Sequence, residues 1–176
     1  MIAIIDRGGA NIASVQFALE RLGAQSVLTR DSAEISAADR VLLPGVGAAP
    51  VAMKALAEAQ LIEPIRQLRK PVLGICLGMQ GIVHSFGGKI IHANEPMHGK
   101  TSFLLHDQKG IHKKIPQNIE IMRYHSLIVE TKSLPSCFVI NGVSQDIDDK
   151  SSILDINKVS FSGEIMAISH KLHPIY

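Results

Sequence analysis

The sequence predicts one domain of the α/β class, in which helices cover both faces of a parallel sheet. A length of 176 residues fits a single domain. The hydrophobic fraction of 46% and the charged fraction of 19% suffice for a buried core and exclude extensive disorder. In the first half, short apolar runs alternate with segments of helical spacing, a pattern typical of a parallel sheet.

The first half contains four expected strands and three expected helices. Strands are predicted at Ile2–Ile5, Gln25–Thr29, Arg40–Leu43 and Pro71–Ile75. Helices are predicted from Ile12 to Leu22, from Ala49 to Arg69 and from about Leu77 to Ser85. Gly23 supplies a stop signal for the first helix. Pro64 is expected to break the second, because proline lacks the donor that a helix interior needs.

After Gly87 and Gly88 the pattern changes to short alternating strands. These are predicted at Lys89–His92, Thr101–Leu105, Glu120–Tyr124, Cys137–Asn141, Ser152–Ile156 and Glu164–Ser169. The polar segment Gln145–Lys150 is expected to form an exposed loop.

The composition also changes near the middle of the chain. Residues 1–82 hold fourteen Ala, six Arg and two Lys, whereas residues 83–176 hold two Ala, one Arg and nine Lys. An Ala-rich helical layer followed by a strand-rich layer explains the alanines. The change from Arg to Lys is nearly neutral on solvated faces, so the two layers do not explain it. It favours the joining of two genes that differ in residue composition.

Charge and hydropathy exclude several classes of function. The net charge is +2, with no basic stripe, so we expect no nucleic-acid partner. The longest apolar runs are too short to cross a bilayer, and the N-terminus has no basic region typical of a signal peptide. We therefore expect a cytoplasmic protein with free thiols at Cys76 and Cys137. No pattern indicates a metal or a cofactor, and we expect neither.

The central motif has the form G-x-C-x-G, from Gly74 to Gly78, at a predicted strand-to-helix turn. The analogous serine motif exposes its nucleophile on a sharp elbow above the sheet. A thiol at a helix N-terminus is stabilised as thiolate by the helix dipole, and the Leu77 amide could hold an oxyanion. A buried Cys76 between packing glycines explains the same pattern.

A second glycine motif, Pro44-Gly45-Val46-Gly47, ends the preceding strand at the same carboxyl edge of the sheet. Its backbone could turn an N–H toward the nucleophile, or it could be an ordinary strand-end turn. A dinucleotide fingerprint is rejected, because Pro50 replaces the last glycine and no acidic residue closes a strand about 20 residues later.

These motifs resemble those of the class I (triad) glutamine amidotransferases. Residues 1–82 are similar to the glutaminases of imidazole glycerol phosphate synthases, through Asp6, Gly8, Ala10-Asn11, Phe17–Gly23, Leu42–Gly47 and Gly74–Gln80. Residues 83–176 are similar to anthranilate synthase component II and to aminodeoxychorismate synthase glutaminases, through Phe86–Ile90, Met97–Ser102, Arg123–Val129 and Glu164–Ile168. The changeover coincides with the composition break, so we expect a chimera within one amidotransferase domain.

The resemblance implies a flavodoxin-like three-layer sandwich, with a mostly parallel sheet, a smaller antiparallel sheet and the final strand missing. It also implies roles for particular residues. Cys76 would be the nucleophile that forms a thioester with glutamine. Leu77, Gly45, Val46 and Gly47 would form the oxyanion hole. Gln80, His125, Ser126 and Leu127 would contact the substrate.

One departure from the family pattern affects the expected activity. The family carries its catalytic His and Glu in a Gly-x-Gln-Phe-His-Pro-Glu segment after Pro-Ile-Tyr, whereas this chain ends at Pro174-Ile175-Tyr176. The resemblance therefore implies an incomplete triad and weak or absent turnover. His173-Pro174 is a candidate shifted base, but Ile rather than Glu follows it. His170 is assigned to the end of the last predicted strand.

Three functions follow from the resemblance. The first is a glutaminase that feeds ammonia to a synthase partner, either a cyclase barrel of histidine biosynthesis or a chorismate-using component. The second is a non-catalytic binding or scaffold module with the same fold. The third is a recombined chain that keeps the architecture of the fold and has no further function.

Overall fold

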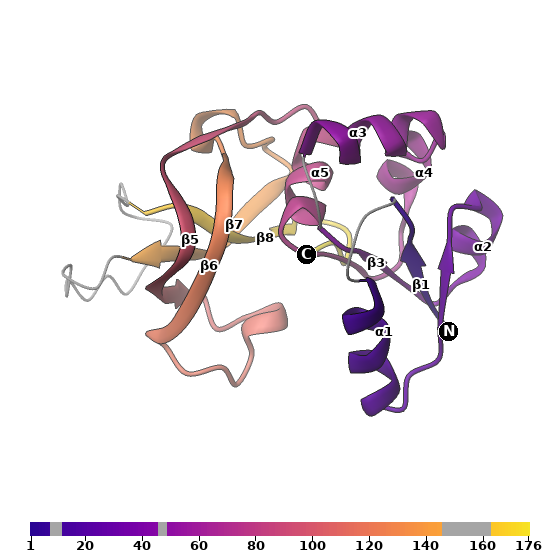
Figure 1. Ribbon diagram of the computed structural model, residues 1–176, viewed down its shortest axis with the longest axis horizontal. Coiled ribbons are helices and arrows are strands. Elements are labelled where there is room, and N and C mark those ends of the chain that lie inside the picture. Colours follow the sequence, from indigo (N-terminus) through magenta and orange to yellow (C-terminus); the bar gives the residue numbers. More distant parts are fainter. Residues whose placement is uncertain (8–11, 46–48, 146–162) are drawn as a thin grey trace. The chain divides into compact units, whose positions relative to one another are not determined.

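The four apolar runs of the first half form a parallel sheet with the strand order β2-β1-β3-β4 (Figure 1). Its strands are β1 (Ile2–Ile5), β2 (Ser26–Thr29), β3 (Arg40–Leu43) and β4 (Val72–Gly74). The computed structural model describes residues 1–7, 12–45, 49–145 and 163–176. The chain divides into a first unit, Met1–Phe86 with Leu172–Tyr176, and a second unit, Gly87–Lys171.

Helices lie on both faces of this sheet, as the sequence predicts. They are α1 (Ile12–Arg21), α2 (Ser32–Ala37), α3 (Ala49–Glu58), α4 (Ile62–Gln67) and α5 (Leu77–Ser85). Figure 1 shows α1 on one face of the sheet and α3 and α5 on the other. The core between sheet and helices is aliphatic and includes Ile4, Ile5, Val41, Leu43, Leu56, Ile65, Val72, Ile82 and Val83. Each of these side chains removes apolar surface from water, which stabilises the sheet–helix packing.

Local signals account for the helix ends. Gly23 has a φ of +68°, and its amide donates to the carbonyl of Glu20 at 2.9 Å, so it ends α1 as predicted. Helix α2 is absent from the sequence-based prediction. Its N-cap is Asp31, whose side chain accepts a hydrogen bond from the amide of Ala33 at 2.7 Å.

The predicted break of the 49–69 helix at Pro64 is wrong. The chain leaves the helix at Gln60, which has a φ of 54°, and the Leu61 amide closes the turn onto Leu56 O at 2.9 Å. Pro64 is the third residue of α4. In the first turn of a helix an amide has no intrahelical acceptor, so proline is tolerated there.

The second unit is built on an antiparallel sheet with the order β6-β5-β7-β8. Its strands are β5 (Ile90–His106), β6 (Ile119–Val129), β7 (Phe138–Gln145) and β8 (Ile165–His170). The 3₁₀ turns Gly110–His112 and Thr131–Ser133 lie between them. The strand and loop expected within residues 146–162 lie outside the described residues.

Two predicted strands, Lys89–His92 and Thr101–Leu105, are one continuous strand, β5, of 17 residues. Register shifts against β6, between His92 and Met97 and between His98 and Lys100, absorb the irregular backbone. Such bulges let one strand continue past residues that do not fit a regular ladder.

The predicted fold class is confirmed, with two differences in detail. Among the described residues the antiparallel sheet has four strands, as many as the parallel sheet, so it is not the smaller of the two. The final strand was expected to be missing, but the last three residues pair with the edge of β4. Val72 and Gly74 donate backbone hydrogen bonds to Pro174 and Tyr176 at 2.9 and 2.7 Å, and Val72 forms a parallel bridge with Ile175.

This pairing predicts that Ile175 stabilises the first unit. Its side chain is 1% exposed, so Ile175→Ala should lower the free energy of unfolding by about 2–5 kcal/mol. Leu172, in the same segment, is 83% exposed, and Leu172→Ala is the matched control that should change it little. Urea unfolding followed by circular dichroism measures both. Equal midpoints for the two variants would contradict the packing of this segment.

Candidate functional site

Cys76 lies on a sharp backbone turn between β4 and α5. Its φ of 54° and ψ of −114° fall in a region that residues with a side chain rarely adopt. The turn is closed by hydrogen bonds from Ile75 N to Leu43 O at 3.0 Å and from Gly78 N to Ile75 O at 2.8 Å. Cys76 is exposed, so the alternative of a thiol buried between glycines is wrong.

Three glycines make this turn possible, because backbone atoms approach where a Cβ would stand. A Cβ on Gly78 would lie 1.7 Å from Leu43 O. One on Gly74 would lie 2.6 Å from the Met79 amide nitrogen. One on Gly45 would lie 2.1 Å from Ile75 O and 2.2 Å from the Leu77 amide nitrogen. Since real Cβ contacts are longer, each of these positions requires glycine.

The candidate oxyanion groups Leu77 and Gly45 are therefore in direct backbone contact beside Cys76. Leu77 is the first residue of α5, so its amide belongs to the positive end of a nine-residue helix. An amide at this position can donate to an anion, since the first amides of a helix have no intrahelical acceptor. The other two predicted oxyanion residues, Val46 and Gly47, lie outside the described residues.

Gln80 lies in the first turn of α5, where its amide donates to Cys76 O at 3.2 Å. The residue is 5% exposed. The three other predicted substrate contacts, His125, Ser126 and Leu127, are consecutive on β6 in the second unit. They lie opposite the register shift of β5 between His92 and Met97. Successive strand residues face opposite sides of a sheet, so the side chains of Ser126 and Leu127 diverge.

His125 belongs to a buried charged cluster that the sequence did not reveal. Arg123, which is 2% exposed, donates to Ser102 Oγ at 2.9 Å and to His125 Nε2 at 3.3 Å, and forms an ion pair with Glu164. His125 Nε2 lies 3.7 Å from Glu164 Oε2. Burial is the main cause that lowers the pKa of His125, and the nearby Glu164 carboxylate opposes it.

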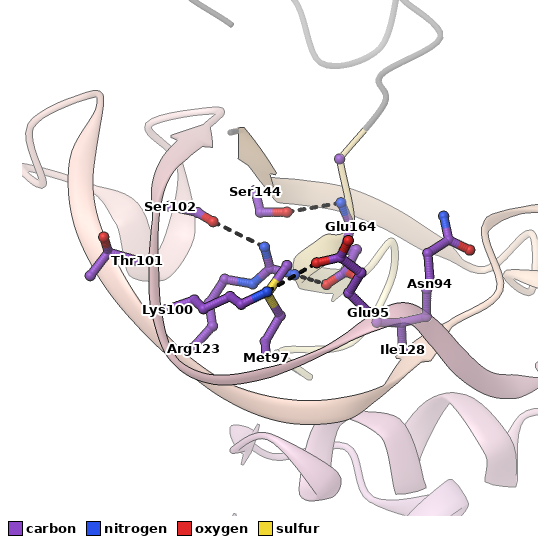
Figure 2. A pocket seen from close by; sticks show the side chains of 11 residues that line it. Asn94, Glu95, Met97, Lys100, Thr101, Ser102, Arg123, Ile128, Ser144 and Glu164 are labelled. Carbon is purple, nitrogen blue, oxygen red and sulfur yellow. Dashed lines mark hydrogen bonds and ion pairs between the residues drawn. The ribbon is translucent and has the colours of Figure 1, made fainter. Parts of the chain in front are cut away.

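Arg123, Ser102 and Glu164 of this cluster line a cavity of about 500 Å³ in the second unit (Figure 2). Lys100 and Glu95, which form an ion pair 3.0 Å apart, line the same cavity. Ser144 Oγ accepts the Glu164 amide at 2.9 Å. Each cation that lines the cavity thus has a carboxylate partner within it.

The remaining predicted histidines occupy ordinary structural positions. His170 is the last residue of β8, as predicted, and packs edge-on against the ring of Phe138 with centroids 5.4 Å apart. His173 precedes the segment that covers β4, and its carbonyl accepts the Ile175 amide at 2.8 Å. In the described part of the chain, no group of three His, Cys, Asp or Glu residues could hold a metal ion. None of the described helices is long and apolar enough to span a membrane.

Comparison with known proteins identifies the family. The family model "Glutamine amidotransferase class-I" matches residues 3–176, nearly the whole chain. The chain belongs to the class-I glutamine amidotransferase family. This confirms the resemblance predicted from the Cys76 motif.

Curated relatives in the family match parts of the chain. The imidazole glycerol phosphate synthase subunit HisH of Xanthomonas axonopodis pv. citri is 58% identical over 79 residues, which is 45% of this chain and 40% of the relative. HisH of Idiomarina loihiensis is 53% identical over 90 residues, 51% of this chain and 46% of the relative. The bifunctional protein TrpGD of Thermotoga maritima is 42% identical over 106 residues, 60% of this chain and 15% of the relative. The chain thus spans less than half the length of these relatives.

Solved structures share the fold of this amidotransferase chain. A Thermoplasma acidophilum protein assigned as a GMP synthase component superposes with a TM-score of 0.80 at 23% identity, covering 99% of this chain and 80% of the other. A glutamine amidotransferase from Thermotoga maritima gives a TM-score of 0.65 at 18% identity, covering 82% and 67%.

The sequence motif located the turn at Cys76, called the elbow from here on, but gave no indication of a role for Arg7. This arginine lies two residues after β1, at the same carboxyl edge of the sheet, and is 4% exposed. Its Nη2 donates a hydrogen bond to Pro44 O. A charged residue two positions after a buried strand, at the edge where ligands bind, is the signal that could have indicated it.

The close contact at Gly78 predicts a large difference between two neighbouring glycines of α5. Gly78→Ala should lower the free energy of unfolding by more than about 3 kcal/mol, because its Cβ would overlap Leu43 O. A Cβ on Gly81 would lie 3.6 Å from Met53 Sδ, an ordinary contact, so Gly81→Ala should be neutral or stabilise by up to about 1 kcal/mol. Urea unfolding measures both. If Gly78→Ala is as stable as Gly81→Ala, the elbow is packed differently.

The surroundings of His125 predict that stability falls in mild acid. The unfolded histidine titrates near 6.5, and burial lowers the pKa in the folded protein. The unfolded chain therefore binds the proton first, so stability is fully present above about pH 6.5 and is lost as the pH falls. Urea midpoints between pH 5 and 7.5 should show this slope, and His125→Gln should reduce it. His112, whose pKa burial also lowers, should supply the remaining slope. The exposed His92→Gln is the control, and a His125→Gln slope equal to that of His92→Gln would contradict the assignment.

Proposed function

We propose that this chain is the glutaminase component of an amidotransferase and releases ammonia from glutamine for a synthase partner. The observation that carries the proposal is the exposed Cys76 on a strained turn, beside the Leu77 amide at the start of α5. Similarity to HisH proteins supports imidazole glycerol phosphate synthase, in histidine biosynthesis, as the parent enzyme. The partner would then be a cyclase barrel.

In this proposal Cys76 sulfur attacks the side-chain amide carbon of glutamine. The new bond joins sulfur to carbon, and the carbonyl oxygen becomes an oxyanion held by the Leu77 amide and the Gly45 loop. The carbon–nitrogen bond then breaks, and the thiol proton leaves with the nitrogen as ammonia. Water hydrolyses the thioester, which restores the thiol and yields glutamate.

Substrate recognition is proposed for Gln80 and for the strand segment His125–Leu127. Gln80 would contact the amino-acid end of glutamine from the first turn of α5. Ser126 and Leu127 would hold its α-amino and carboxylate groups. Because their side chains diverge, at least one of the two would act through its backbone.

Proton transfer is the weak point of the 176-residue polypeptide. Its sequence contains no Gly-x-Gln-Phe-His-Pro-Glu segment, which supplies the base in the family pattern. A general base contributes about 10²–10⁴-fold to rate. We therefore propose that this polypeptide both forms and hydrolyses the acyl-enzyme slowly.

The alternative parent is an anthranilate or aminodeoxychorismate synthase, whose partner uses chorismate. Similarity to TrpGD supports it over a longer stretch than the HisH matches, at lower identity. A chimera of the two lineages accounts for both. Its support is the composition change after residue 82, which lies close to the unit boundary at Phe86–Gly87. A non-catalytic module or a fold recombination would keep the same elbow without acyl transfer.

Incubation with glutamine separates these proposals. We expect intact-mass spectrometry of quenched samples to show a γ-glutamyl adduct on Cys76, with ammonia release about 10²–10⁴-fold slower than in glutaminases with a full triad. Cys76→Ala should abolish both signals, and Cys137→Ser should leave both unchanged. Turnover at the rate of intact glutaminases would refute the incomplete triad. An absent adduct on a folded, alkylatable Cys76 would favour the non-catalytic module.

A further inference from the structure

Arg7 is a buried cation whose hydrogen bonding is incomplete. Its Nη2 donates to Pro44 O, whereas its Nη1 is buried and finds no hydrogen-bond partner in the described part of the chain. A buried donor without an acceptor costs free energy, more so when it carries charge. Such a group in a folded protein needs a functional or structural reason.

The position of Arg7 connects it to the elbow through the backbone. β1, β3 and β4 are adjacent in the sheet, so the residues that follow them meet at one edge. The acceptor Pro44 precedes Gly45, whose α-carbon packs against Ile75 O and the Leu77 amide. Arg7 thus holds Pro44, the neighbour of Gly45, and Gly45 in turn contacts the Leu77 amide, the candidate oxyanion group.

Charge provides a second connection. Burial lowers the pKa of Arg7, and the charge of Cys76 opposes this shift. The sulfur and the guanidinium are therefore close enough to interact electrostatically. Because that attraction is mutual, the guanidinium stabilises negative charge that develops at the nucleophile during its reaction.

We propose that Arg7 is a positioning residue of the glutaminase centre, which holds the Pro44–Gly45 backbone against the elbow and places a buried positive charge near Cys76. The inference rests on the proposed function, since it assigns Arg7 to the acylation of Cys76. Negative charge lies first on sulfur and then on the substrate oxygen. A fixed cation stabilises both without reorganising.

Alkylation by iodoacetamide tests the charge, since the thiolate is the reacting form. All proteins carry Cys137→Ser, so that Cys76 is the one remaining thiol. Arg7→Gln keeps a donor for Pro44 O and removes the charge, so it should slow alkylation at pH 7 by at least about threefold. Arg7→Lys should restore the alkylation rate to near the wild-type value. Arg40→Gln, at an exposed arginine, is the matched control and should not change this rate.

A diazoketone analogue of glutamine tests the role of Arg7 in acylation. Its labelling of Cys76 should be slowed in Arg7→Gln at least as strongly as iodoacetamide alkylation, and rescued in Arg7→Lys. Circular dichroism confirms that each variant is folded. Rates in folded Arg7→Gln that equal the wild type with both reagents would overturn the inference while leaving the glutaminase proposal intact. If the analogue does not label Cys76 of the wild type, but alkylation by iodoacetamide still depends on Arg7, the glutaminase proposal is refuted. The inferred charge near Cys76 is then retained.

Discussion

The arrangement of the first unit depends on backbone-to-backbone contact between the start of α5 and the loop after β3. Leu43 O lies where a Cβ on Gly78 would stand, and Gly45 lies against the Leu77 amide. Contacts of this closeness leave no room for side chains, so they fix the helix against the sheet with little freedom to slide. The unusual backbone of Cys76 follows, because the chain must turn within two residues between β4 and α5.

The same contact links stability to reactivity. A non-glycine residue with these dihedral angles costs free energy, and the packing around it must supply that energy. In the proposed mechanism, the gain is an exposed thiol beside the first amides of α5, which would stabilise a developing negative charge. A more relaxed turn would stabilise the fold and move the sulfur away from these amides.

The sequence predicted the elements that local chemistry determines. The strand at Ile2–Ile5, the stop at Gly23 and the helix at Leu77–Ser85 agree with the structure, because apolar runs and glycines act locally. Pro64 misled the prediction, since proline breaks a helix interior but fits a first turn. The continuity of β5 could not be predicted, because its pairing with β6 across register shifts is a tertiary property. The Cys76 elbow was predictable from its glycine spacing, whereas the contacts of Arg7 and the Arg123–Glu164 pair join residues far apart in the sequence.

The pairing of the C-terminal residues bears on the proposed chimera of two lineages. Residues 172–176 follow the second unit in sequence but belong to the first unit, where Ile175 is paired with Val72. That pairing uses backbone hydrogen bonds and one buried aliphatic side chain, which many sequences can supply. A junction after residue 82 would therefore leave the elbow, with its glycines and Arg7, entirely within one lineage. The other lineage would contribute to the first unit only a strand partner of low sequence specificity. A junction at this point would preserve the contacts that leave no room for a side chain, among them the packing of Gly78 on Leu43 O.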